Sequence, residues 1–159
     1  MAMTELHRRY LARETAVSAV VNAALSGFVC WLVFGRSGAA SIDDARAFAT
    51  DFLPQAFILS LMSTLVPGAV TRRRMRMGEV QALEGPPSKL PRNLLLRALC
   101  IAGLAMLIGG GAALLLTLAV WQGPLSIAQV YAIKVLFGVL LAVPVTRIGL
   151  RAALADRVT

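Results

Sequence analysis

Four apolar stretches, each close to twenty residues long, dominate this 159-residue chain. They span residues 15–34, 52–70, 98–121 and 127–146, and only the last contains a charged residue, Lys134. A helix needs about 20 residues to cross the hydrocarbon core of a bilayer. Because lipid offers no partner to an unpaired backbone amide, helices are the structure that such stretches adopt there. The sequence therefore predicts an all-α, multi-pass membrane protein with four transmembrane helices.

The charges between these stretches predict how the chain is oriented. Its net charge is +8, and most of the basic residues lie in the N-terminal tail, in the loop 72–92 and in the C-terminal tail. The segment 35–51 has nearly balanced charges, and the turn 122–126 has none. Cytoplasmic loops carry an excess of Lys and Arg, so we expect both termini to face the cytoplasm. Because the basic residues follow the expected topology, no nucleic-acid partner is predicted.

The chain divides at its central loop into two similar halves. Residues 1–71 form a first predicted hairpin, residues 72–92 a basic loop rich in Pro and Gly, and residues 93–159 a second hairpin. Pro67 and Pro144 each lie near the end of a second helix and are followed by an arginine. A duplicated two-helix unit explains this match, and chance similarity between apolar segments explains it equally well.

A tryptophan late in the first helix and a proline-then-arginine exit from each second helix characterise the chain: Trp31, Pro67, Arg72, Pro144 and Arg147. In these residues the chain resembles small bacterial inner-membrane proteins that are built from two-helix hairpins and have no assigned activity. The resemblance implies the same membrane and the same hairpin construction. It transfers no functional residue to this chain.

A polar stripe is the clearest local pattern inside a predicted span. Glu14, Ser18, Asn22 and Ser26 recur at every fourth residue, which places them on one face of a helix. One interpretation is structural, because hydrogen bonds of Ser and Asn between membrane helices contribute about 0.6 kcal/mol each on average. The other is a path for a small solute, a proton or a lipid headgroup. Glu14 follows Arg13 at the start of the span, where we expect an interfacial ion pair.

A second polar group is expected near the outer face. Lys134 lies about seven residues inside the fourth span, and Asp51 and Gln55 lie at a comparable depth at the start of the second. Three interpretations are open for Lys134. Its ammonium group extends to the membrane surface, it forms an internal pair with Asp51 or Gln55, or it binds an anionic ligand.

Small residues form a ridge on the third predicted helix. Ala105, Gly109 and Ala113 repeat at four-residue spacing, a pattern that lets another helix approach closely. The ridge is expected to pack within the chain or against a second copy. Because four helices enclose little space, we expect a homo-oligomer or a larger membrane complex.

A run of arginines leaves the second helix directly: Arg72, Arg73, Arg74 and Arg76. Each basic residue near the surface attracts anionic lipid headgroups by about 1 kcal/mol. The lipid bilayer and its anionic headgroups are therefore expected partners. The same residues also account for the predicted topology.

No motif in the chain predicts catalysis. The sequence contains no Ser/His/Asp set, no carboxylate pair and no cluster with metal-ligand spacing, so we expect neither an enzyme nor a bound metal or cofactor. The favoured prediction is a non-enzymatic accessory or scaffold subunit that packs through its small and polar helix faces. The alternative is an oligomeric small transporter or channel subunit that uses the stripe around Asn22 and Ser26.

Overall fold

The computed structural model describes residues 4–33, 41–83, 88–121 and 123–156. Most of them belong to four long helical rods: α1 (Glu5–Val33), α3 (Phe52–Arg76), α4 (Leu94–Ala105) continued by the π-helical turn η2 (Met106–Gly110) and α5 (Gly111–Val120), and α6 (Ile127–Leu154). A short helix, α2 (Ala45–Thr50), precedes α3, and together they form one apolar rod. All four rods are long and apolar enough to cross a membrane. The predicted all-α architecture is confirmed, and the candidate spans imply a lipid bilayer around it.

Side-chain caps explain where several helices begin. The carboxylate of Asp44 accepts hydrogen bonds from the backbone of Arg46 and Ala47 and starts α2. The Asn93 side chain does the same for the first turn of α4. Ser126 starts α6 through reciprocal bonds with Gln129, the pattern known as a capping box. These caps satisfy amides that the first turn of a helix leaves without partners.

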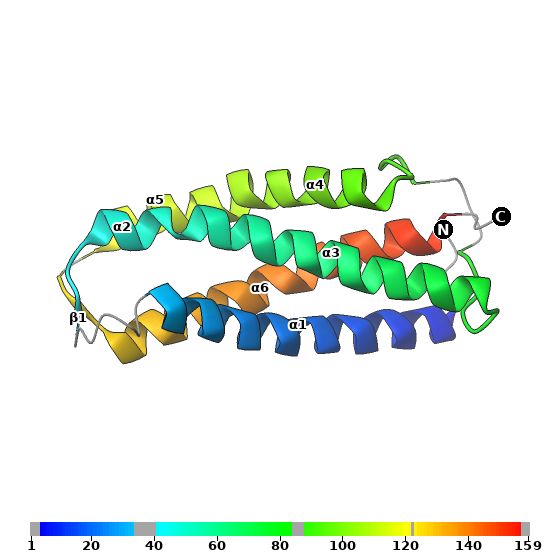
Figure 1. Cartoon of the computed structure of the whole chain (residues 1–159), viewed down its shortest axis with the longest axis horizontal. Helices are drawn as coiled ribbons and strands as arrows, with labels where there is room; N and C mark the ends of the chain where they lie inside the picture. Colours follow the sequence, from blue (N-terminus) through cyan, green and yellow to red (C-terminus); the bar gives the residue numbers. More distant parts are fainter. Residues whose placement is uncertain (1–3, 34–40, 84–87, 122, 157–159) are drawn as a thin grey trace.

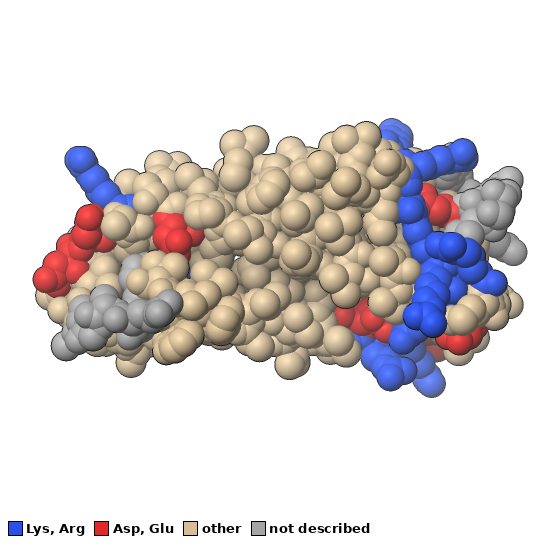
Figure 2. Space-filling view, viewed as in Figure 1, with Lys and Arg blue, Asp and Glu red and all other residues tan. Residues whose placement is uncertain are grey.

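The two ends of the bundle differ in charge. Figure 1 shows both termini at one end of the molecule and the strand β1 at the other. At that second end, β1 (Ser41–Ile42) pairs antiparallel with β2 (Leu125–Ser126), a contact that the sequence does not predict. Lys and Arg side chains gather around the end with the termini, as Figure 2 shows, and we call this the arginine-rich end.

The helices pack mainly between the two predicted hairpins rather than within each hairpin. The helices α3 and α6 pack against each other in the middle of the bundle, α1 packs most extensively on α6, and α4 packs on α3 (Figure 1). The first helix of each half therefore packs mainly on the second helix of the other half. The two halves share one interior.

Apolar clusters close both ends of that interior. Cys30, Phe48, Phe52 and Val130 form the aromatic cluster at the end with the strands. A second cluster at the arginine-rich end consists of Leu11, Leu83, Leu150 and Leu154. Between the two, many of the buried side chains are polar, whereas the outward side chains of the rods are largely Leu, Ile and Val. This distribution suits a chain whose surroundings are hydrocarbon.

Candidate functional site

The polar stripe of α1 faces the interior of the bundle. Ser18, Asn22 and Ser26 are buried against polar side chains of α3 and α6. We call the whole set the polar seam, and it consists of Thr15, Ser18, Asn22, Ser26, Gln55, Ser60, Ser63, Thr64, Lys134 and Thr146. Of these residues, Ser18, Asn22 and Ser26 on α1 and the pair Gln55 and Lys134 were predicted, and Thr15 was not. The hydroxyl residues of α3 and α6 in the seam were not predicted either. On α3, Ser60, Ser63 and Thr64 are three and four residues apart, and this helical spacing could have indicated them.

Hydrogen bonds in the middle of the seam join three helices. The amide nitrogen of Asn22 donates to the Ser63 hydroxyl on α3 at 2.8 Å and to the Ser18 carbonyl at 2.7 Å. The Ser18 hydroxyl in turn lies 2.7 Å from the Thr146 hydroxyl on α6. Asn22 and Ser18 therefore connect α1 to both central helices.

Closer to the aromatic cluster, the seam continues with contacts around Ser26. The Gln55 amide nitrogen donates to the Ser26 hydroxyl at 3.4 Å and to the Lys134 carbonyl at 3.2 Å. Gly138 of α6 faces the same hydroxyl, and a Cβ atom at this position would overlap Ser26 Oγ. The absence of a side chain at Gly138 therefore allows α1 and α6 to approach closely.

Lys134 forms an internal ion pair. Its ammonium nitrogen lies 3.0 Å from a carboxylate oxygen of Asp51 and donates to the Phe48 carbonyl at 3.2 Å. The same nitrogen lies over the Phe52 ring, 3.6 Å from its centroid, a favourable cation–π position. Because the Lys134 side chain is 1% exposed, it does not extend to the surface. Of the three interpretations left open by the sequence, the structure shows the internal pair.

Four oxygen atoms of the seam retain hydrogen-bonding capacity. Thr15 Oγ1, Asn22 Oδ1, Gln55 Oε1 and Ser60 Oγ are buried and have no hydrogen-bond partner among the described residues. A buried polar group without a partner costs about 1–3 kcal/mol. The seam thus contains more hydrogen-bonding groups than its own side chains satisfy.

Glu14, the first member of the predicted stripe, lies outside the seam. Its carboxylate forms an ion pair with Arg74 of α3 at 2.7 Å. The Arg74 guanidinium also lies 5.7 Å from the centroid of the Tyr10 ring. The expected pair with the adjacent Arg13 is therefore replaced by a contact between helices, because Arg74 lies opposite Glu14 at the arginine-rich end.

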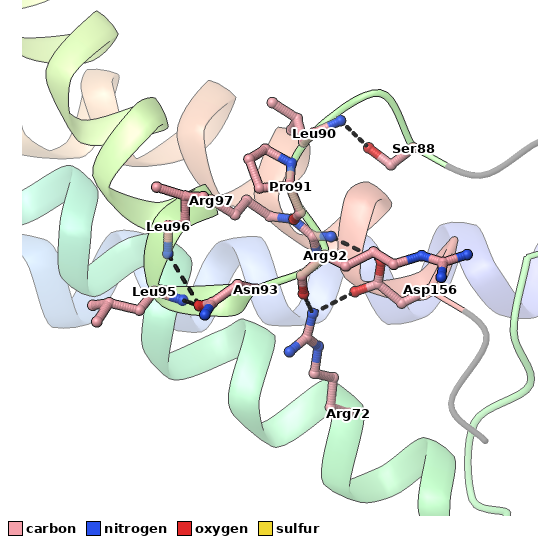
Figure 3. A network of polar contacts seen from close by, with 10 residues as sticks. All are labelled: Arg72, Ser88, Leu90, Pro91, Arg92, Asn93, Leu95, Leu96, Arg97 and Asp156. Carbon is pink, nitrogen blue, oxygen red and sulfur yellow. Dashed lines mark hydrogen bonds and ion pairs between the residues drawn. The ribbon is translucent and has the colours of Figure 1, made fainter.

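A buried cluster at the same end joins residues far apart in the sequence. Figure 3 shows Arg72 of α3 and Arg97 of α4 reaching the carboxylate of Asp156, which follows α6. The distances are 2.7 Å to Arg72 and 2.8 Å to Arg97, and each guanidinium contacts a different carboxylate oxygen. Neither Arg97 nor Asp156 was predicted as a site residue. Neither residue belongs to a motif, and no sequence spacing connects them.

Asp156 lies beyond the spanning helices, and its surroundings favour the charged form. Burial raises the pKa of this carboxyl, but the hydrogen bonds and charges of Arg97 and Arg72 outweigh burial and lower the pKa below its ordinary value. The carboxylate is therefore an anion at neutral pH.

The arginine run divides into paired and exposed members. Arg72 and Arg74 form ion pairs with Asp156 and Glu14, while Arg73 and Arg76 are exposed. Arg73 and Arg76 therefore remain the predicted contacts for anionic lipid. Arg72 and Arg74 also hold helices together.

The small-residue ridge packs against helices of its own chain. A Cβ atom at Gly109 would lie 2.8 Å from Leu141 of α6, and one at Gly110 would lie 3.1 Å from the Phe52 carbonyl of α3. Ala113 packs against the aromatic cluster, and Ala105 is half-buried. Close helix contact was predicted for this ridge, and at Gly110, beside Gly109, the rod lies close to the backbone of α3.

An apolar cavity of about 660 Å³ lies at the end with the strands. Phe48, Leu116, Trp121 and Ile133 are among the side chains that line it, so it lies between α2, α5 and α6. In the described part of the chain, no three His, Cys, Asp or Glu residues are placed to hold a metal ion.

No protein-family model, curated protein or solved structure matches this chain. Its function is therefore inferred from its own geometry. The polar seam and the cluster around Asp156 are two arrangements of polar or charged groups inside the bundle. The cavity offers apolar contacts, with Thr117 as a polar side chain in its wall.

Proposed function

We propose that this chain is a non-enzymatic accessory or scaffold subunit of the bacterial inner membrane. Its arginine-rich end and both termini lie in the cytoplasm, because positive charge is retained on that side. Its partners are the bilayer, anionic headgroups at Arg73 and Arg76, and further copies or other proteins of a membrane complex. The polar seam holds the subunit's own helices together, and the apolar exterior meets lipid and partner helices.

The observation that carries this proposal is the bonding of the polar seam to itself. Asn22 bonds to Ser63, Ser18 to Thr146, and Gln55 to both Ser26 and the Lys134 carbonyl. These contacts use the polar groups of α1 to fix its position on α3 and α6. The tight approach of Ser26 to Gly138 supports packing rather than a path wide enough for a solute.

The ion pairs formed by the acidic side chains and Lys134 inside the bundle support a role without catalysis. General acid–base chemistry needs a titratable group that can reach a substrate. Lys134 is paired with Asp51, Glu14 with Arg74, and Asp156 with two arginines. Each of these charges is engaged in a contact that holds helices together.

Partner capture tests the proposal directly. Purification of the full chain from its native membrane, in a mild detergent after amine cross-linking, is expected to recover a membrane protein or a second copy at fixed stoichiometry. Arg147→Gln, at an exposed position of α6, serves as a matched control, because it adds no amine for the cross-linker and should leave recovery unchanged. Recovery of the chain as a monomer, without a stoichiometric companion, would contradict the proposal.

A second candidate is a proton-conducting subunit, and the four unpartnered oxygens favour it. They lie along the seam between the arginine-rich end and the Lys134–Asp51 pair. The eleven residue-to-residue steps from Thr15 to Ser26 cover about 16 Å at a rise of 1.5 Å per residue, roughly half of the hydrocarbon core. Water bonded to the free oxygens would link the hydroxyls into a chain suited to proton transfer.

Asn22→Leu separates the two candidates. For a scaffold, we expect this variant to lower the free energy of unfolding by about 1–2 kcal/mol, because the bonds to Ser63 and Ser18 are lost. Proteoliposomes with either wild type or variant should then show no more proton flux than liposomes without protein. The exposed neighbour Val21 supplies the matched control, Val21→Leu, which is expected to leave stability unchanged. Proton flux through wild type that folded Asn22→Leu abolishes would favour the conducting subunit instead.

A further inference from the structure

The cluster around Asp156 holds two cations on one anion. The Asp156 carboxylate bridges Arg72 and Arg97, with one oxygen on each guanidinium (Figure 3). Both of its oxygens are therefore in use. Counting these three side chains alone, two positive charges face one negative charge.

Arg97 has a donor that the carboxylate does not reach. Its Nε donates to the Pro91 carbonyl at 3.0 Å and its Nη2 to Asp156, but its Nη1 is buried without a hydrogen-bond partner among the described residues. The Arg97 side chain is 0% exposed, so bulk solvent does not serve this donor. Buried charged donors normally have a hydrogen-bond partner, because a buried donor without a hydrogen bond is energetically unfavourable.

We propose that Arg72 and Arg97 form a binding site for a terminal phosphate group, and that Asp156 occupies this site as an internal competitor. A terminal phosphate has three or more acceptor oxygens and a charge of about −1.5 to −2 at neutral pH, which matches two guanidiniums better than one carboxylate does. Its additional oxygen is a partner for Arg97 Nη1. The same group occurs on inorganic phosphate and on the headgroup of phosphatidic acid.

The position of Asp156 allows such an exchange. It follows the last turn of α6, so rotation of its side chain vacates the two arginines while the helix stays in place. Arg72 is 21% exposed, which opens one side of the cluster at the arginine-rich end. This site is independent of the proposed scaffold role, because it uses none of the residues of the polar seam.

Calorimetric titration of the purified full chain in detergent tests the site. The probes are inorganic phosphate and short-chain phosphatidic acid, with short-chain phosphatidylcholine as the uncharged comparison. Asp156→Asn removes the internal competitor and is expected to bind a terminal phosphate at least tenfold more tightly than wild type. Arg97→Gln is expected to abolish binding. Arg147→Gln, which removes an exposed arginine of α6 outside the cluster and outside the expected lipid contacts, should bind as wild type does.

The results also identify the source of the phosphate. Binding of phosphatidic acid alone assigns the site to a lipid headgroup, binding of inorganic phosphate alone assigns it to a soluble anion, and binding of both supports the shared chemistry. If Arg97→Gln does not fold, Arg72→Gln replaces it, because this partly exposed arginine leaves the Arg97–Asp156 pair intact. The proposal is overturned if Asp156→Asn binds neither probe more tightly than wild type, or if Arg147→Gln weakens binding as much as the cluster variants do.

Discussion

Replacing Asp51 by Asn is expected to lower the free energy of unfolding by about 3–5 kcal/mol, the usual effect of breaking a buried ion pair from one side. The variant leaves the Lys134 ammonium with the Phe48 carbonyl and the rings of Phe48 and Phe52 as its remaining contacts. Because the Lys134 side chain is 1% exposed, water does not replace the lost carboxylate.

Lys134→Met is expected to have a smaller effect than Asp51→Asn. It leaves a carboxylate that is 23% exposed and able to bind water, and Met retains much of the lysine stem. The double variant should recover most of the stability lost by Asp51→Asn, since no unpaired charge remains. Asp43→Asn, at an exposed position near the same end, is the matched control.

A double-mutant cycle measured by reversible unfolding in detergent micelles gives the coupling between these residues. Equal losses of unfolding free energy in Asp51→Asn and Lys134→Met would show that the deeper burial of Lys134 does not make its unpaired charge the more unfavourable of the two. Additive effects in the double variant would show that the ion pair itself contributes nothing.

Gly138→Ala is expected to lower the free energy of unfolding by about 1–3 kcal/mol, the typical effect of overpacking. The added methyl group would overlap Ser26 Oγ and would lie 3.2 Å from Leu59 Cδ1. Relief requires the Ser26 hydroxyl to rotate away or α1 to move away from α6, and either change would also disturb the bond between Gln55 and Ser26.

Gly103 provides the matched control, since a Cβ atom at this position meets nothing within 4 Å. Gly103→Ala is expected to raise stability by up to about 1 kcal/mol through helix propensity alone. Combining Gly138→Ala with Ser26→Gly should restore part of the lost stability by removing the overlapping hydroxyl. Thermal unfolding in detergent compares all three, and a neutral Gly138→Ala would show that the helices do not depend on this close approach.

The fold could be predicted because lipid places its requirement on each stretch of sequence separately. A segment of about 20 apolar residues satisfies its own amides as a helix, whatever its neighbours are. The burial of Ser18, Asn22 and Ser26 on one face followed from the same local geometry, since residues four apart share a helix face. The Asn93 side chain explains why α4 begins at Leu94, but the sequence alone did not single out this residue as a cap.

The pairing of side chains could not be predicted in the same way. Asp156 is 84 residues from Arg72 and 59 from Arg97, and any of several arginines was an equally good partner by sequence. Glu14 bonds to Arg74, 60 residues away, although Arg13 is its neighbour. Hydroxyl residues of α3 and α6 joined the seam only because those two helices occupy the middle of the bundle.

By itself, the sequence determined that this chain forms four apolar rods with basic segments on one side, because hydropathy, helix periodicity and charge act over one helix or one loop. The tertiary structure alone decided that Lys134 is enclosed with Asp51, that the stripe of α1 bonds to Ser63 and Thr146, and that Asp156 bridges two arginines. Those contacts depend on which helices become neighbours. That choice follows from how the rods fit together, as at Gly138 and Gly110, and not from the polarity of any one of them.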